Sequence, residues 1–172
     1  MGLDITAYRQ LVKAPAGSDP EADWDRCFRF YVNPEFSGRD AGLEPGTVYV
    51  RPEPSATYEF RAGSYRGYND WRNALARLAG FARGAEQAWN DGLEHGPFIE
   101  LINFSDCEGV IGPVVSAKLA RDFAEWQERA NSLAEKGRGA PWCDAPVWFL
   151  GLYAHWRKAF EMAADGGAVA LH

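Results

Sequence analysis

The sequence predicts an α+β fold in which about three main helices pack on a mixed β-sheet. Three observations carry this prediction. Short segments that suit strands fill residues 1–62, and apolar residues at helical spacing dominate residues 68–172. The chain has 172 residues, of which 47% are hydrophobic, so it can bury one substantial core. Because no internal repeat or low-complexity tract divides the chain, we expect a single globular domain over residues 1–172.

The strand-rich part begins with Leu3 and Ile5, which alternate with polar neighbours as the residues of a half-buried strand do. Pro52 and Pro54 lack the amide donor that a sheet ladder needs. The segment around these prolines is therefore expected to be an exposed connection or an edge. Further strands are expected at residues 27–32, 47–50 and 58–61.

Two helices are predicted from apolar residues that recur at steps of three and four. The first covers residues 71–89, with Asn69 or Asp70 as its N-terminal cap. The second covers residues 115–133 and follows Pro113, because proline suits the first turn of a helix. A third helix, apolar on most faces, is expected at about residues 145–164, and a terminal strand is expected at residues 168–171.

One apolar segment separates the first two helices. The run from Phe98 to Phe104 is too apolar to alternate and too short for a helix of its own. Strands that are buried on both faces have this composition, so we expect a central strand at residues 98–104. The loop over residues 105–113 would then leave the carboxyl end of the sheet, where pockets commonly form.

Charge and cysteine content limit the classes of function. The net charge of -6 argues against nucleic acid as a partner, because phosphate backbones need clustered Lys and Arg. Cys27, Cys107 and Cys143 form no CxxC pair and have no His in metal-binding register, which is typical of a cytoplasmic protein. The longest apolar run is far shorter than the ~20 residues of a membrane span. We expect no signal peptide, no membrane contact, no metal and no cofactor.

The loop over residues 105–113 carries the first group of candidate site residues. Asp106 and Glu108 either contact a ligand or stabilise a turn and the following helix start. Glu100 lies inside the apolar run, so it faces a wet pocket, meets an arginine or marks an exposed edge. Cys107 is interpreted as a small structural side chain rather than a nucleophile, since no cysteine-hydrolase motif surrounds it.

The second group lies in the loop over residues 61–72, where glycines free the backbone and arginines add positive charge. Its tyrosines offer flat surfaces on which a ring of a ligand can stack. The alternative is a strand end, a glycine turn and a helix cap with exposed arginines. Neither a Rossmann nor a P-loop motif is present. Across both loops, the candidate ligand contacts are Arg61, Ser64, Tyr65, Arg66, Tyr68, Glu100, Asp106 and Glu108.

Three stretches of the chain carry a resemblance to other proteins. MGLDIT at the start, GSYRGYNDWR at residues 63–72 and INFSDCEGVIGP at residues 102–113 resemble stretches shared by a group of uncharacterised bacterial and phage proteins. The resemblance spans most of the chain and transfers no activity or site residue. It implies a small cytoplasmic accessory protein of prophage origin.

Three functions fit these observations. The first, which we favour, is a non-enzymatic protein that binds an anionic, nucleotide-like small molecule between the two loops, as a phage anti-defence protein that sequesters it. The second is a hydrolase or transferase that uses Asp106, Glu108 or Glu100 as acid or base. The third is a protein–protein interaction module with an exposed aromatic surface, which includes a homo-oligomer.

Overall fold

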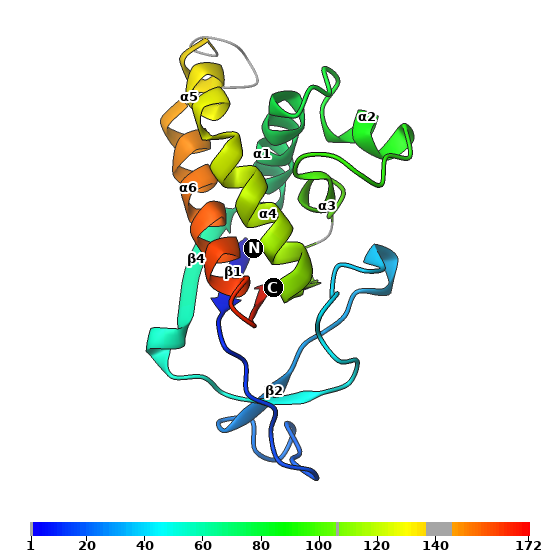
Figure 1. Cartoon of the computed structure of the whole chain (residues 1–172), viewed down its shortest axis with the longest axis vertical. Helices are drawn as coiled ribbons and strands as arrows, with labels where there is room; N and C mark the ends of the chain where they lie inside the picture. Colours follow the sequence, from blue (N-terminus) through cyan, green and yellow to red (C-terminus); the bar gives the residue numbers. More distant parts are fainter. Residues whose placement is uncertain (1, 106, 137–145) are drawn as a thin grey trace.

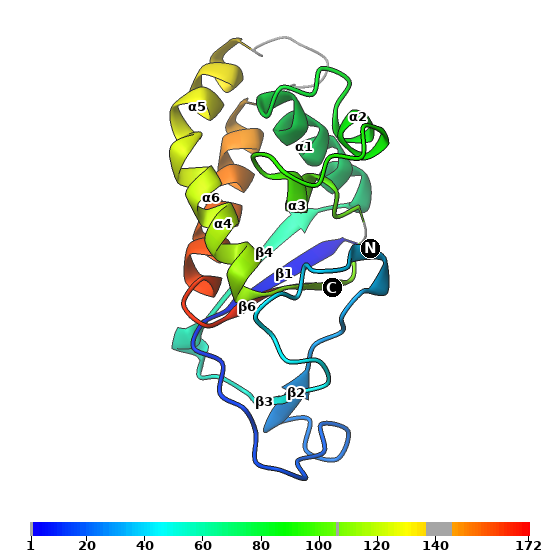
Figure 2. The same ribbon diagram turned by 45° about the vertical axis from the view of Figure 1, so that its right-hand side comes forward.

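The computed structural model describes residues 2–105, 107–136 and 146–172. A four-stranded sheet with the order β4-β1-β6-β5 forms its centre, and helices cover one face of this sheet (Figures 1 and 2). The α+β class is confirmed, although every pairing in the sheet is antiparallel rather than mixed. The strands are β1 (Leu3–Tyr8), β4 (Thr57–Gly63), β5 (Gly109–Ile111) and β6 (Ala168–Leu171).

Strand β1 lies inside the sheet, between β4 and β6. Its alternation matches the prediction at the start of the strand: Leu3 and Ile5 are buried, and Asp4 between them is exposed. The Thr6 hydroxyl of β1 and the Nε2 atom of His172, the residue that follows β6, form a hydrogen bond of 3.1 Å. The predicted terminal strand is confirmed as β6, which pairs with both β1 and β5.

Fully buried aromatic side chains hold the helical layer together. Trp71 and Trp156 stack with their ring centroids 5.7 Å apart, and both are 0% exposed. The Tyr153 side chain is also buried, and its hydroxyl donates a hydrogen bond of 2.9 Å to the Phe123 carbonyl. The long helices are α1 (Tyr65–Leu78), α4 (Pro113–Glu125), α5 (Gln127–Lys136) and α6 (Pro146–Ala163).

The predicted helix at residues 71–89 is divided and starts earlier than expected. Ser64, rather than Asn69 or Asp70, caps α1, because its Oγ accepts a hydrogen bond of 3.0 Å from the Gly67 amide. The chain leaves the helix after α1 and resumes in a short helix, α2 (Ala85–Asn90). Glycines at positions 80 and 84 adopt positive φ angles of 103° and 84°, which ends one helix and redirects the chain into the next.

The predicted central strand at residues 98–104 is wrong. Phe98 has a left-handed conformation with φ 58°, and the short helix α3 (Ile99–Ile102) follows it. A short apolar run suits a buried strand and a buried helix equally well, and here tertiary packing decides. The strand that joins the sheet is β5, which lies inside the segment predicted to be a loop.

The second predicted long helix is interrupted at Trp126, between α4 and α5. The third is confirmed as α6. Among the described residues, no helix has both the length and the apolar character that crossing a membrane requires.

The strand predicted at residues 58–61 is part of β4 in the main sheet. The strands predicted at residues 27–32 and 47–50 form a separate small sheet, in which β2 (Cys27–Arg29) pairs with β3 (Val48–Val50). Figure 2 shows this hairpin below the main sheet, on the side away from the helices. It is attached through aromatic contacts: the Tyr8 ring of β1 stacks on Phe28, with centroids 5.2 Å apart. Two short 3₁₀ helices, η1 (Pro34–Phe36) and η2 (Pro54–Ala56), lie in the connections.

Candidate functional site

The predicted loop over residues 61–72 makes a buried contact with the residue that precedes the loop over residues 105–113. The Tyr68 hydroxyl in α1 donates a hydrogen bond of 3.0 Å to the Phe104 carbonyl, which follows α3. Tyr68 is only 3% exposed, and its burial raises the pKa of its hydroxyl above the ordinary value. In this structure Tyr68 joins two segments of the protein instead of facing a ligand.

The other candidates in the first loop point to the outside. Ser64 is occupied as the cap of α1, and Arg61 lies at an exposed position on β4. The Arg66 side chain is 93% exposed, and its Nε atom is 3.9 Å from the Asp70 carboxylate. Tyr65 is 44% exposed. None of these four residues lines any of four well-formed cavities in the described part of the chain.

The candidate acids are not gathered into one site either. The Glu100 carboxylate accepts a hydrogen bond of 2.6 Å from Lys118 Nζ, which also contacts the Asp122 carboxylate at 2.8 Å. Glu108 is exposed, and Asp106 lies outside the described residues. Within the described part of the chain, no group of three or more His, Cys, Asp or Glu residues is placed to hold a metal ion.

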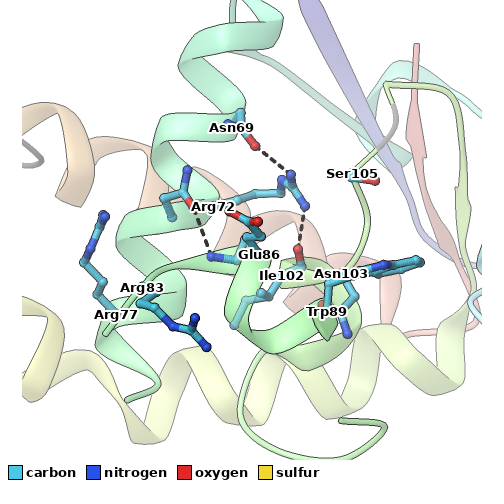
Figure 3. A pocket seen from close by; sticks show the side chains of 11 residues that line it. Asn69, Arg72, Arg77, Arg83, Glu86, Trp89, Ile102, Asn103 and Ser105 are labelled. Carbon is cyan, nitrogen blue, oxygen red and sulfur yellow. Dashed lines mark hydrogen bonds between the residues drawn. The ribbon is translucent and has the colours of Figure 1, made fainter. Parts of the chain in front are cut away.

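A cavity of about 410 Å³ lies between α1, α2 and the segment that follows α3 (Figure 3). Three arginines line it, Arg72, Arg77 and Arg83, and we call it the arginine cavity. Among the described residues of its lining, Glu86 is the one that is acidic. This local excess of positive charge contrasts with the net charge of -6 of the whole chain.

Arg72 forms the inner wall of the arginine cavity. Its Nη1 donates to the Ile102 carbonyl at 2.5 Å, and its Nη2 donates to Asn69 Oδ1 at 2.8 Å, as the dashed lines in Figure 3 show. Its Nε atom is buried without a hydrogen-bond partner. Arg72 is 6% exposed, and burial lowers the pKa of its guanidinium, while the neighbouring Tyr68 opposes this shift.

The shape of the arginine cavity depends on the break between α1 and α2. Asn73 on α1 accepts a hydrogen bond of 2.9 Å from the Ala85 amide, which fixes the start of α2 against α1. Gly84 precedes this contact, and a Cβ atom at that position would lie 2.4 Å from Asn73 Oδ1. Close approach of the two helices therefore requires glycine here.

The far end of the cavity is formed by Trp89 and Asn103. Trp89 at the end of α2 is 58% exposed, which is unusual for so large a ring. Asn103 is 8% exposed; its Nδ2 donates to the Leu93 carbonyl at 3.4 Å, and its Oδ1 is buried without a partner. Figure 3 shows Arg77 and Arg83 on one side of the cavity and Asn103 on the other.

The lining of this cavity was missed in the sequence, apart from the position of Arg72 within the loop over residues 61–72. A usable signal was present. Positions 72, 73 and 77 follow position 69 by three, four and eight residues, so the four polar side chains form a stripe along one side of the helix. Arg83 and Trp89 could not be added to this stripe, because the break after α1 was not anticipated.

Comparisons of the chain with models of protein families, with curated proteins and with solved structures gave no match.

Proposed function

We propose that this protein binds an anionic, nucleotide-like small molecule in the arginine cavity. This is the function favoured from the sequence, with its site moved from the exposed turn before α1 to the cavity between α1 and α2. Phosphate and carboxylate groups are natural ligands for guanidinium, which presents several donors in a fixed plane. Sequestration of such a ligand suits the phage accessory role that the sequence resemblance implies.

The observation that carries the proposal is Arg72. Its guanidinium is buried at the wall of the cavity, and it belongs to none of the ion pairs found among the described residues. Burying an ionised group costs several kcal/mol unless an opposite charge accompanies it. Carbonyl and amide oxygens offset part of this cost, and an anion bound in the cavity would supply the missing countercharge.

The dimensions and the other residues of the cavity agree with such a ligand. Its volume of about 410 Å³ falls within the range of pockets that hold small molecules. Arg77 and Arg83 add two further positive charges, and the exposed ring of Trp89 offers a surface for stacking. A phosphate group beside an aromatic ring is the combination that nucleotides share.

A thermal-shift assay on the whole chain tests the proposal with pyrophosphate and with the diphosphates of adenosine, guanosine, cytidine and uridine. A ligand that binds only the folded state raises Tm, by roughly 5–10 °C at about 100-fold excess over Kd. Arg83→Gln should remove most of this rise, because Arg83 is exposed and lines the cavity. Arg66→Gln is the matched control, since Arg66 is equally a surface arginine but lies outside the cavity.

No rise with any of these compounds would overturn the proposal. A rise that is lost in Arg66→Gln and kept in Arg83→Gln would return the site to the turn before α1.

A second candidate function, protein–protein interaction, is favoured by one observation. Large apolar side chains are exposed next to β2: Trp24 is 68% exposed and Tyr31 is 57% exposed. Light scattering during size-exclusion chromatography would report a homo-oligomer through this surface. A Trp24→Ser variant should then be monomeric, and a monomeric wild-type chain would remove homo-oligomerisation from this candidate.

A further inference from the structure

A second cavity, of about 520 Å³, lies next to the arginine cavity. Trp89 and Asn103 line both cavities, so the two are neighbours at these side chains. Residues from η1 and its surroundings form the far wall of the second cavity, together with the segment that follows α2. We call it the acidic cavity, because Glu35 and Glu94 line it.

The two cavities differ in charge. Counting the described residues alone, the arginine cavity is lined by three arginines and one glutamate, whereas the acidic cavity is lined by two glutamates and Arg39. The Arg39 Nε atom is already engaged, because it donates a hydrogen bond of 2.9 Å to the Glu100 carbonyl. Carboxylates accept hydrogen bonds from hydroxyl and amino groups and repel phosphate. The acidic cavity therefore suits the uncharged, donor-rich part of a ligand.

The wall between the cavities offers both an aromatic surface and a polar acceptor. Trp89 is largely exposed there, and Phe36 and Leu93 add apolar surface on the acidic side. Asn103 Oδ1 accepts no hydrogen bond in the structure, although its amide nitrogen is directed to Leu93. A buried acceptor without a donor is unfavourable, so a ligand donor at this junction would stabilise the bound state.

We propose that the two cavities form one bipartite site for a nucleoside diphosphate. The arginine cavity holds the phosphate groups, Trp89 stacks on the base, and the acidic cavity accepts hydrogen bonds from ribose hydroxyls and base amino groups. The opposite charges of the two cavities fix the direction in which the ligand lies. This inference rests on the proposed function, and it adds that the nucleoside part contributes to binding through the acidic cavity.

Isothermal titration calorimetry on the whole chain separates the two parts of the ligand. Pyrophosphate probes the arginine cavity alone, and the diphosphates of adenosine, guanosine, cytidine and uridine probe both cavities. At least one nucleoside diphosphate should bind about tenfold or more tightly than pyrophosphate, because stacking of a base on an aromatic ring strengthens binding by about that factor.

Two substitutions assign this gain to the acidic side of the site. Trp89→Ala and Glu94→Gln should each bring the affinity for the preferred nucleotide toward that for pyrophosphate. Glu94→Gln, which lies outside the arginine cavity, should also leave pyrophosphate binding within about twofold of wild type. Trp24→Ala is the control for loss of an exposed tryptophan, since Trp24 is 68% exposed and lines neither cavity. It should leave both affinities unchanged.

The outcomes distinguish this inference from the function on which it rests. Binding of pyrophosphate with no gain from any nucleoside overturns the bipartite site and leaves the arginine cavity in place. A gain that survives both substitutions overturns it as well, because the nucleoside would then bind elsewhere. Absence of binding by every compound overturns the bipartite site and the proposed function together.

Discussion

At the scale of the residue, Tyr68 shows how burial changes the role of a side chain. Its ring lies between the Arg72 guanidinium, 5.5 Å from the ring centroid, and the core ring of Trp156, 5.9 Å away. Its hydroxyl reaches across to the Phe104 carbonyl. The sequence offered the same tyrosine as a stacking platform beside exposed arginines, because composition alone does not reveal on which face of a helix start a residue lies.

Tyr68→Phe should therefore destabilise the protein without a direct effect on ligand binding. The substitution keeps the ring but leaves the buried Phe104 carbonyl without its donor, at a cost of about 1–3 kcal/mol. Urea unfolding measures this change. Tyr31→Phe, at a 57% exposed position, is the control and should shift the free energy of unfolding by less than about 0.5 kcal/mol. Equal stability of the two variants would contradict the bridging role of Tyr68.

At the scale of the element, the break between α1 and α2 creates the arginine cavity. The apolar spacing over residues 71–89 correctly indicated helix at both ends of this segment, but it gave no sign of the turn between them. Gly80 and Gly84 were the available signal, since paired glycines near a helix end favour positive φ. The helical period over residues 71–89 predicts one continuous helix that includes Trp89, against this signal.

Gly84→Ala should test how tightly this break is constrained. The added Cβ atom would sit on a residue with a positive φ angle of 84° and would clash with the Asn73 side chain. In Gly80→Ala the φ angle is also positive, 103°, but the Cβ atom has no neighbour within 4 Å. The backbone angles of Gly84, φ 84° and ψ -159°, lie in a region essentially restricted to glycine, so strain in Gly84→Ala costs about 1–3 kcal/mol, and the clash with Asn73, which Gly80→Ala lacks, should add about 1–2 kcal/mol. Thermal unfolding of the two variants gives this difference directly. If they are equally stable, α1 and α2 are not in close contact at Asn73.

A second inter-element contact explains Glu100. Lys118 on α4 is bonded to the carboxylates of Glu100 and Asp122 and to the Gly96 carbonyl, and Asp122 accepts a hydrogen bond of 2.7 Å from the Phe98 amide. These contacts join α4 to the turn that starts α3. The carboxylate predicted as a possible ligand contact is thus paired inside the fold, through a lysine that lies eighteen positions later in the chain.

Lys118→Met should cost about 1–3 kcal/mol in the free energy of unfolding, because it leaves two mostly buried carboxylates without their cation. Arg157→Met is the control, since it breaks the more exposed pair with Glu161 and should cost less than about 1 kcal/mol. Chemical denaturation of both variants measures these losses in the free energy of unfolding. A loss in Lys118→Met no larger than that in the control would show that the cluster does not stabilise the turn.

At the scale of the whole molecule, the buried tyrosines set the response to alkaline pH. Burial raises the pKa of both Tyr68 and Tyr153, while Arg72 and Arg157 respectively act in the opposite direction. In the unfolded chain both hydroxyls titrate near pH 10. Above that pH the folded protein still holds protons that the unfolded chain has released, so rising pH favours unfolding. The stabilisation is complete below about pH 10 and is lost above it.

The free energy of unfolding should accordingly fall above about pH 10, by roughly 1.4 kcal/mol per pH unit for each of the two tyrosines. Urea unfolding at a series of pH values measures the slope. A variant that carries both Tyr68→Phe and Tyr153→Phe should be less stable at neutral pH and should show a shallower fall in alkali. The same slope in this variant and in wild type would contradict the assignment to these two residues.

The sequence predicted the α+β class, the long third helix and the terminal strand, because each depends on a strong local pattern. The separate sheet of β2 and β3 and the position of β5 depend on pairings between segments distant in the chain, which local patterns do not encode. The cavity follows the same rule. Its polar stripe on α1 is local and visible, while Trp89 and Asn103 are brought to it only by the packing of α2 and the segment after α3.

The most direct test of the arginine cavity is a titration of the ¹⁵N-labelled chain with pyrophosphate, followed by ¹H–¹⁵N NMR. We predict that the largest shifts occur at the Trp89 indole NH and the Arg72 Nε–H, with the Trp89 signal assigned from a Trp89→Phe variant. The chemical shifts of the backbone amides of residues 61–66 should not change. Shifts confined to residues 61–66, with the Trp89 and Arg72 signals unmoved, would contradict an anion site between α1 and α2.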